Sequence, residues 1–170
     1  MQIKEAENIM KLKNNSIQKP CEISVFDVAA YILSKLGKTT TMKLQKLVYY
    51  SQAWSLVWDD RPLFSEEIQA WANGPVCPAL YSAHRHQFEI INISGGNLDN
   101  LDDIAKETID SVLKYYGDKS SQWLRDLTHM EDPWMQARGN TPDGDICQNC
   151  IDLASMAEYY SSLPKDEQSV

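Results

Sequence analysis

The chain has 170 residues, the size of a single ordinary domain that can bury a core of its own. Its apolar fraction of 43% and charged fraction of 24% are typical of globular proteins, and no apolar run reaches the roughly 20 residues of a membrane-spanning helix. The formal net charge of −8 disfavours nucleic acid as a partner, because nucleic-acid binders neutralise phosphates with Lys and Arg.

The N-terminal sequence and the cysteines indicate where the protein resides. Residues 1–15 mix charged and apolar side chains and lack the apolar stretch of a secretory signal, so we expect a cytoplasmic protein. Four cysteines are too few and too unevenly spaced for a disulfide framework, and we expect reduced thiols. They are Cys21, Cys77, Cys147 and Cys150.

Charge is unevenly distributed along the chain. Residues 1–60 carry eight lysines and six acidic residues, whereas residues 97–145 carry eleven acidic residues and five basic ones. An acidic second half suits a basic partner protein, although a solvated face also explains any single charge.

Residues 1–20 are predicted to form an arm and tether outside the body of the protein. Apolar residues fall at helical spacing near its start, but a helix of about a dozen residues is marginal in water by itself. We therefore expect the arm to pack on the body or to wait for a partner. The body should cover residues 21–163, with residues 164–170 as a flexible tail.

Two helices should open the body. Ser24 is a good N-cap for a helix that ends at Gly37. Thr41 can cap a longer helix over about residues 42–58, which leaves only a narrow polar stripe. A helix that is apolar over most of its circumference lies at the centre of a domain, so this helix should organise the fold.

A small β element should follow. Residues 67–72 alternate well enough for a short strand, which the sequence Asn73-Gly74-Pro75 should end, with Pro75 beginning a helix that runs to about His86. Residues 88–93 are rich in β-branched side chains and are expected to pair with the first strand.

The rest of the chain is predicted to be helical apart from one loop. Helices are expected over residues 102–116, 120–129 and 152–163, with a helical turn at residues 132–134 and a loop at residues 141–149. The predicted fold class is therefore mainly α: a compact helical domain around a central buried helix (about 42–58), with a small two-stranded β element.

The pair Cys147 and Cys150 has the spacing of metal and redox motifs. A zinc site needs about four ligands and no second pair exists, so Cys77 and the three histidines would have to converge by folding. No βαβ pattern surrounds the pair, as redox motifs usually require. We expect no catalytic residues, no metal and no cofactor, and a thiol- or metal-dependent enzyme remains the alternative from a different class.

Three segments carry sequence motifs that indicate a protein family more specifically than the composition does. The first is Lys43-Leu44-Gln45-Lys46-Leu47-Val48-Tyr49-Tyr50-Ser51-Gln52-Ala53-Trp54. The second runs from Phe64 through Ala70-Trp71-Ala72-Asn73-Gly74-Pro75-Val76 to Tyr81, and the third is Leu127-Thr128-His129-Met130-Glu131-Asp132-Pro133-Trp134. In order and spacing they closely resemble the Panacea antitoxin domain, the family of GepA-like phage-associated proteins and SocA-type proteolytic adaptors. The resemblance runs from about Val25 to Tyr160.

The resemblance implies an antitoxin of a two-gene toxin–antitoxin system, with no enzymatic activity and no cofactor. Members of the family neutralise unrelated protein toxins by direct contact, among them alarmone synthetase-like enzymes that block translation. SocA-type members instead deliver a toxin to the ClpXP protease, which is the alternative function within the same class. The implied partners are thus a cognate protein toxin and, under the alternative function, a ClpXP-type protease, with neither nucleic acid nor a membrane.

The motif residues divide into two groups. Those expected to contact a partner are Lys43, Gln45, Lys46, Tyr49, Trp71, Asn73, His129 and Trp134, and those expected to shape the motif turns are Gly74, Pro75, Val76 and Pro133. For the tryptophans, a place in the core is the better explanation. The three polar residues of the central helix either cap neighbouring elements by hydrogen bonds or face a partner groove. Residues 1–20 and the loop Thr141 to Cys150, which has no counterpart in the motifs, are expected to supply toxin specificity.

Overall fold

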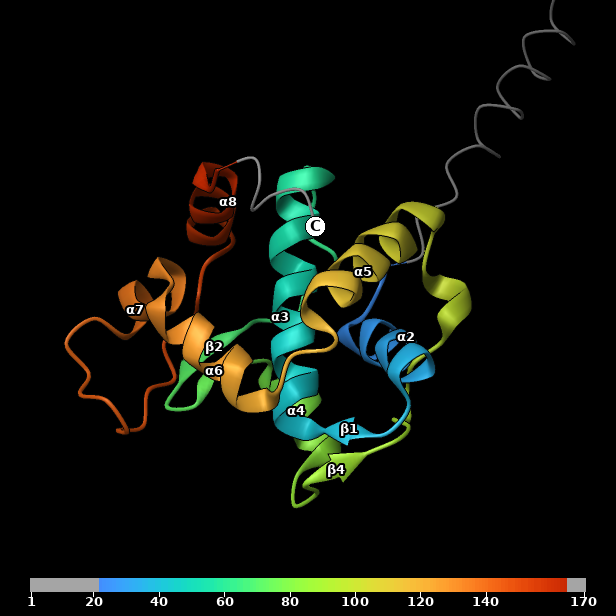
Figure 1. The fold of residues 1–170 in the computed structure, drawn as a ribbon, viewed down its shortest axis with the longest axis horizontal. Helices are drawn as coiled ribbons and strands as arrows, with labels where there is room; N and C mark the ends of the chain where they lie inside the picture. The colour runs from blue at the N-terminus through green and yellow to red at the C-terminus, as the bar shows by residue number, and fades with distance from the viewer. Residues whose placement is uncertain (1–21, 165–170) are drawn as a thin grey trace, which may run out of the picture.

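The computed structural model describes residues 22–164 (Figure 1). The predicted arm and nearly all of the predicted tail lie outside these residues. Within them the chain forms seven α-helices and two small two-stranded antiparallel sheets, so the prediction of a mainly α fold with a small β element is confirmed. None of the described helices combines the length and the apolar character needed to cross a bilayer.

The central helix is α3 (Thr41–Trp58), which stands upright in the middle of Figure 1 with the other helices around it. Every residue from Leu44 to Ser55 is buried. Helices α2 (Val25–Leu36), α5 (Asp103–Tyr116), α6 (Ser121–Met130) and α8 (Leu153–Ser162) pack against it. The predicted organising helix is thus present, and its burial on all sides explains its weakly amphipathic sequence.

Capping residues set most helix boundaries where the sequence predicted them. Ser24, Asp102, Ser120 and Asp152 each accept a hydrogen bond from a backbone N–H in the first turn of the following helix. At α3 the prediction was one residue late. Thr40 is the N-cap, because its backbone is extended and its Oγ1 accepts from Lys43 N at 3.2 Å, so Thr41 is already helical.

The predicted strand pairing was wrong. Strand β2 (Gln69–Trp71) pairs with β3 (Gly74–Val76), and β4 (Glu89–Ile90) pairs instead with β1 (Thr39–Thr40), which precedes α3. Residues 72–73 form the turn between these two strands, and Gly74 follows it with a φ of 108°, which favours glycine. The segment predicted to end the strand therefore forms a hairpin.

The same hairpin moves the start of the next helix. Pro75 lies in β3 opposite Ala70, and α4 (Pro78–His84) begins at Pro78 rather than at Pro75. Proline at the first helical position loses no hydrogen bond, which is the reason either proline was acceptable on sequence alone. After β4 the chain passes through a short 3₁₀ helix, η1 (Leu98–Asn100), into α5.

The last part of the fold is a helical pair joined by a long loop. Helix α7 (Asp132–Arg138) extends the predicted turn, and the chain returns to α8 through the predicted loop. Ala70 N donates to Asn149 O at 2.9 Å and Ile151 N donates to Ile68 O at 2.8 Å, so the end of the loop lies along the outer edge of β2. The loop is therefore attached to the hairpin, on the far left in Figure 1.

Candidate functional site

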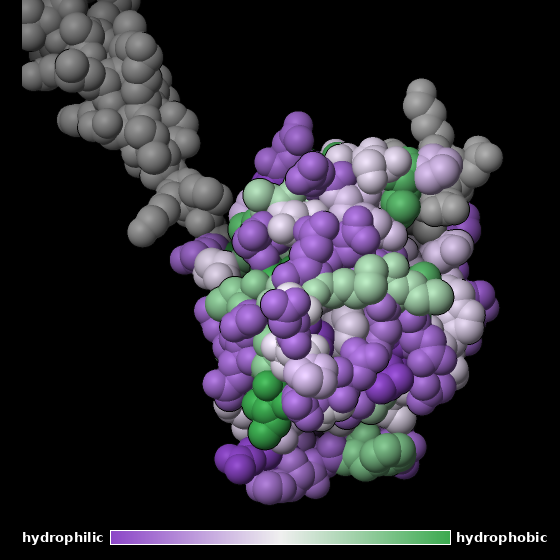
Figure 2. Space-filling view, turned by 90° about the vertical axis from the view of Figure 1, so that its left-hand side faces the viewer, coloured by the Kyte–Doolittle hydropathy of each residue, from purple (hydrophilic) through white to green (hydrophobic). Residues whose placement is uncertain are grey.

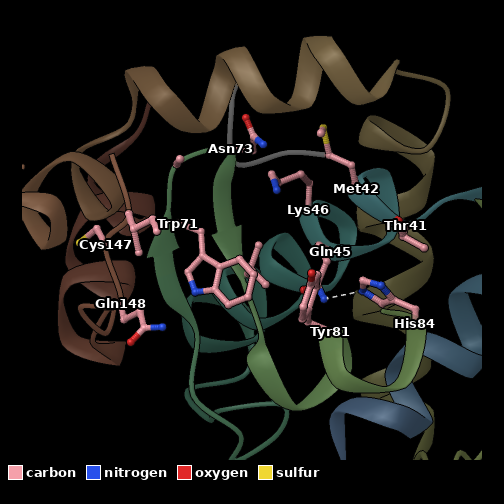
Figure 3. Close-up of a pocket in the computed structure, with 13 residues that line it drawn as sticks. Thr41, Met42, Gln45, Lys46, Trp71, Asn73, Tyr81, His84, Cys147 and Gln148 are labelled. Atoms are coloured by element: carbon pink, nitrogen blue, oxygen red, sulfur yellow. Dashed lines mark hydrogen bonds between the residues drawn. The ribbon is translucent and has the colours of Figure 1, made fainter. Parts of the chain in front are cut away.

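A pocket of about 410 Å³ opens beside the first turns of α3 (Figure 3). Its walls come from four places: α3, the β2–β3 hairpin, α4 and the loop between α7 and α8. Most of its exposed surface is apolar. The residues that line it are Thr41, Met42, Gln45, Lys46, Trp71, Ala72, Asn73, Val76, Tyr81, His84, Ile146, Cys147 and Gln148.

Two aromatic rings form one wall. Trp71 and Tyr81 meet edge to face with ring centroids 4.9 Å apart, and Tyr81 meets the His84 ring in the same way at 5.4 Å. The Trp71 indole N–H is bonded within its own strand, to Gln69 Oε1 at 2.8 Å. Both rings are partly exposed, so they present apolar area to the pocket without an unsatisfied donor.

Gln45 fixes the start of α4 and the state of His84. Cys77 N donates to Gln45 Oε1 at 2.9 Å, so the other side-chain atom of Gln45 is its amide nitrogen, a donor. That nitrogen donates to Cys77 O at 3.3 Å and lies 2.9 Å from His84 Nε2. His84 Nε2 must therefore accept, and burial also lowers the pKa of this histidine. His84 is a neutral acceptor at the pocket floor.

Lys46 is a lysine with almost no exposure. It is 1% exposed, and its amine donates to Pro75 O at 3.2 Å. Burial, and to a smaller extent the charge of Arg125, lower the pKa of Lys46 to about 7. The side chain passes directly over Gly74, where a Cβ would stand 2.5 Å from Lys46 Cε. Gly74 is thus required twice, by its positive φ and by the lysine that crosses it.

Two further basic side chains border the turn at Asn73. Arg125 Nε donates to Asn73 Oδ1 at 3.3 Å. The His129 ring stacks on Trp134 with centroids 3.9 Å apart, and its buried Nε2 has no hydrogen-bond partner among the described residues. Burial, followed by the charges of Arg125 and Lys46, lowers the pKa of His129 to about 4. We call Lys46, Arg125 and His129 the basic cluster.

The predicted partner-binding residues do not all converge. Gln45, Lys46, Trp71 and Asn73 line the pocket, whereas the other four do not. Tyr49 is 1% exposed in the core. Trp134 is 4% exposed and donates to Trp71 O at 2.9 Å.

The first explanation offered for the polar residues of the central helix, capping of neighbouring elements by hydrogen bonds, applies to all three. Lys43, Gln45 and Lys46 all bond to backbone groups of neighbouring elements; the Lys43 amine donates to Gly117 O at 2.6 Å, at the end of α5. Only Gln45 and Lys46 of these three also line the pocket. The motif residues Gly74, Pro75 and Val76 form β3, and Pro133 lies in the first turn of α7.

One wall of the pocket comes from the loop Thr141 to Cys150, which the sequence named as a segment without assigning it to a pocket. Ile146, Cys147 and Gln148 come from the loop, and Ile146 is 88% exposed. The loop is held by Arg138, whose guanidinium donates to Ala70 O, Pro142 O and Asp145 O at 2.7 to 3.0 Å. An arginine followed by Gly, Pro and a lone isoleucine was the available signal, but its carbonyl acceptors could not be identified without the fold.

The thiols do not form a reactive centre in the described part of the chain. Cys77 is buried at the start of α4, which raises its pKa, and a raised pKa weakens a thiol as a nucleophile. Cys147 is buried while Cys150 is exposed and donates from Sγ to Glu67 at 3.1 Å. No group of three or more His, Cys, Asp or Glu side chains within residues 22–164 is arranged to hold a metal ion.

The chain was compared with curated proteins, solved structures and protein-family models. Neither the curated proteins nor the solved structures contained a match. A family model described as "Antitoxin SocA-like, Panacea domain" matches residues 44–135, more than half of the chain. The match includes most of α3, the β2–β3 hairpin, α4 and the residues of the basic cluster, and it ends before the loop that closes the pocket. The chain belongs to the SocA-like Panacea antitoxin domain family.

Proposed function

We propose that this protein is the antitoxin of a two-gene toxin–antitoxin system and that it neutralises its cognate toxin by direct binding and occlusion of the toxin's active site. The observation that supports the binding mode is the apolar, aromatic-walled pocket, most of whose lining residues lie in the family-matched region. Aromatic side chains in a pocket are the usual anchors of protein interfaces. A polar floor formed by Gln45, Lys46 and His84 adds orientation to that contact.

The surface around the pocket supports a localised contact rather than a broad apolar one. Figure 2 shows the side that carries α7 and the loop, where polar surface is interrupted by small, separate apolar patches. A face of this kind gains affinity from a few buried anchors and not from its whole area. Trp71, Tyr81 and the exposed Ile146 are the anchors we assign.

Partly exposed aromatic residues and exposed acidic residues lie in two different places. Trp71 and Tyr81 line the pocket, whereas exposed acidic residues such as Asp103, Glu107 and Asp110 lie on α5. We assign toxin contact to the pocket and long-range attraction of a basic toxin to the acidic surface.

Two segments outside the family match are assigned to toxin specificity. One is the loop from Thr141 to Cys150, which supplies a wall of the pocket. The other is residues 1–20, outside the described residues. Deleting residues 1–19 is expected to weaken neutralisation without changing the unfolding of the body, and an unchanged toxin affinity would remove the arm from this proposal.

The test is growth rescue with co-purification. The gene adjacent to this one is expressed from an inducible promoter, alone and together with this protein. Growth arrest by the neighbour, relief by this protein and recovery of both chains in one complex are the expected results. A harmless neighbour, or arrest that persists with this protein present, contradicts the proposal.

The same experiment separates occlusion from delivery to a protease. In a host that lacks ClpXP, an occluding antitoxin still rescues growth and the toxin level is unchanged. Rescue that depends on the protease, with toxin levels that fall only when it is intact, would assign the chain to the proteolytic adaptors instead.

A further inference from the structure

The amine of Lys46 is buried with too few partners for a charged group. An ammonium has three N–H donors, and among the described residues Pro75 O is the one acceptor that Lys46 reaches. That acceptor is a neutral carbonyl, and no acidic side chain forms an ion pair with Lys46 within residues 22–164. Burying a cation without a counter-charge is costly, and nothing in the described chain offsets this cost.

The charged groups around Lys46 increase the positive potential rather than cancel it. Arg125 from α6 acts on both Lys46 and His129, and each of these two pKa values is lowered partly by that charge. The carboxylates on this side are those of Asp126, 3.4 Å from Arg125, and of Asp143, which acts on His129. The turn at Asn73 and Gly74 thus has three basic side chains beside it, on a chain of net charge −8.

The position of this spot connects it to the pocket. Lys46 and Asn73 both line the cavity, and Figure 3 shows the Lys46 side chain directed towards Asn73, at the opposite end from His84. Gln45 and His84 at the other end are bonded to each other. The pocket therefore has one satisfied polar end, one end that lacks an anion, and an aromatic wall between them.

We propose that this pocket receives a carboxylate side chain of the cognate toxin, which pairs with the Lys46 amine while an adjacent apolar side chain of the toxin packs against Trp71 and Tyr81. The inference rests on the proposed function and specifies its contact. The occupant is an Asp or Glu on an otherwise apolar segment, because the cavity wall is mostly apolar and Lys46 is the one lysine or arginine among the residues that line it.

The rim of the pocket favours a protein segment over a small free anion. Ile146 lines the cavity and is 88% exposed, so a molecule that fills only the interior leaves this side chain in water. A segment that continues across the rim covers it. A cavity of about 410 Å³ is at the small end of ligand sites, and it fits an acidic side chain together with one apolar neighbour.

Pairing of the Lys46 amine with a carboxylate should be accompanied by a measurable uptake of protons. The free amine, with a pKa of about 7, is roughly half neutral at pH 7, and a carboxylate beside it favours the ammonium form. Binding of the toxin should therefore take up roughly half a proton at pH 7, more at pH 8 and almost none at pH 5.5. Calorimetry of the wild-type pair in buffers of different ionisation enthalpy measures this uptake and needs no variant of the antitoxin.

The experiment uses this protein in full length and the product of the adjacent gene. Lys46→Met should weaken the dissociation constant at least tenfold and abolish the proton uptake, whereas Lys35→Met on the exposed side of α2 should change neither. Each Asp and Glu of the toxin is then changed to its amide. One amide variant of the toxin should bind the wild-type antitoxin more weakly than the unchanged toxin does, and without proton uptake. The same toxin variant should bind the Lys46→Met antitoxin no more weakly than the unchanged toxin does.

The outcomes separate the inference from the function on which it rests. Equal affinity of the wild type and a folded Lys46→Met variant, or proton uptake that survives in every amide variant, overturns the carboxylate contact and leaves the antitoxin function intact. If Lys46→Met does not fold, the proton uptake and the amide variants decide alone. Failure of the wild type to bind the neighbour or to rescue growth removes the proposed function itself.

Discussion

The buried polar groups at the middle of α3 and those near its start differ in whether they have partners. Towards the middle of the helix, Tyr50 donates to Glu131 Oε1 at 2.6 Å and Tyr160 donates to the same oxygen at 2.9 Å. The Tyr160 and Tyr49 hydroxyl oxygens are 3.0 Å apart. Near the start of the helix, the Lys46 amine reaches a single carbonyl and the nearby His129 Nε2 reaches nothing among the described residues.

This difference separates a cluster that stabilises the fold from a cluster that we assign to binding. In the tyrosine cluster (Tyr49, Tyr50, Tyr160 and Glu131), the polar groups are partners of one another, so the cluster needs nothing from outside the chain. Its three tyrosines have pKa values raised by burial and by the Glu131 charge, so they remain neutral donors. The basic cluster has donors in excess of acceptors, as expected of a site completed by another molecule.

The largest effect on stability should follow from disrupting the tyrosine cluster. Glu131→Ala leaves two buried tyrosine hydroxyls without their acceptor, and we expect the free energy of unfolding to fall by about 3–5 kcal/mol in chemical denaturation. Asp126→Ala on α6, whose side chain is 56% exposed, is the control and should cost less than about 1 kcal/mol. Equal losses in both variants would show that the cluster is not a stabilising network.

The next effect concerns the crossing of Lys46 over the hairpin. Gly74→Ala introduces a Cβ that meets Lys46 Cε and Thr128 Oγ1 at a positive φ, and we expect a loss of about 2–4 kcal/mol. Gly139→Ala has a positive φ but open space, so it should lose only the backbone part, about 1–2 kcal/mol. Thermal unfolding of the two variants side by side measures the difference, and similar losses would mean that the close packing of Lys46 is unimportant.

Lys46→Met should produce a smaller effect that depends on pH. The folded pKa of about 7 lies below the ordinary value of 10.5, so between these pH values the unfolded chain binds more protons and wild-type stability rises with pH. The variant lacks this dependence. We expect it to be more stable than the wild type below pH 7, by an amount that shrinks as the pH rises towards 10. A difference that stays constant between pH 6 and pH 10 would contradict a buried, uncompensated amine.

The smallest effect on stability is expected at the rim of the pocket. Ile146→Ala removes a side chain that is 88% exposed, so the free energy of unfolding should change by less than about 0.5 kcal/mol. Toxin affinity should nevertheless fall about five- to tenfold, because the rim is covered in the complex. Ile104→Ala on α5, at 52% exposure and outside the pocket, is the matched control and should leave affinity unchanged.

Local patterns were sufficient for most of the fold. Caps such as Ser24 and Asp152 act on the backbone of their own first turn, so their role is visible without the rest of the chain. The nearly continuous apolar surface of residues 42–58 likewise required a central helix, because no other place in a domain buries a helix on all sides. The family motifs lie on these same elements, which is why the resemblance and the match agree.

The errors came from choices between equivalent local solutions. Thr40 and Thr41 are both acceptable caps, and Pro75 and Pro78 are both acceptable first residues of a helix. The pairing of β4 with β1, across the whole of α3, depends on where the chain returns after α4 and has no local signature.

The sequence by itself determined the helical class, the central helix, most of the caps and the family. The helices and caps depend on patterns within one segment, and the family depends on the order and spacing of three motifs along the chain. Only the tertiary structure decided which motif residues share a site. It placed Gln45, Lys46, Trp71 and Asn73 around one cavity and sent Tyr49 and Trp134 into the core, and it closed the pocket with a loop held by Arg138. The physical reason is that whether a buried polar group has a partner depends on segments far apart in the chain, as the contrast between Lys46 and Glu131 illustrates.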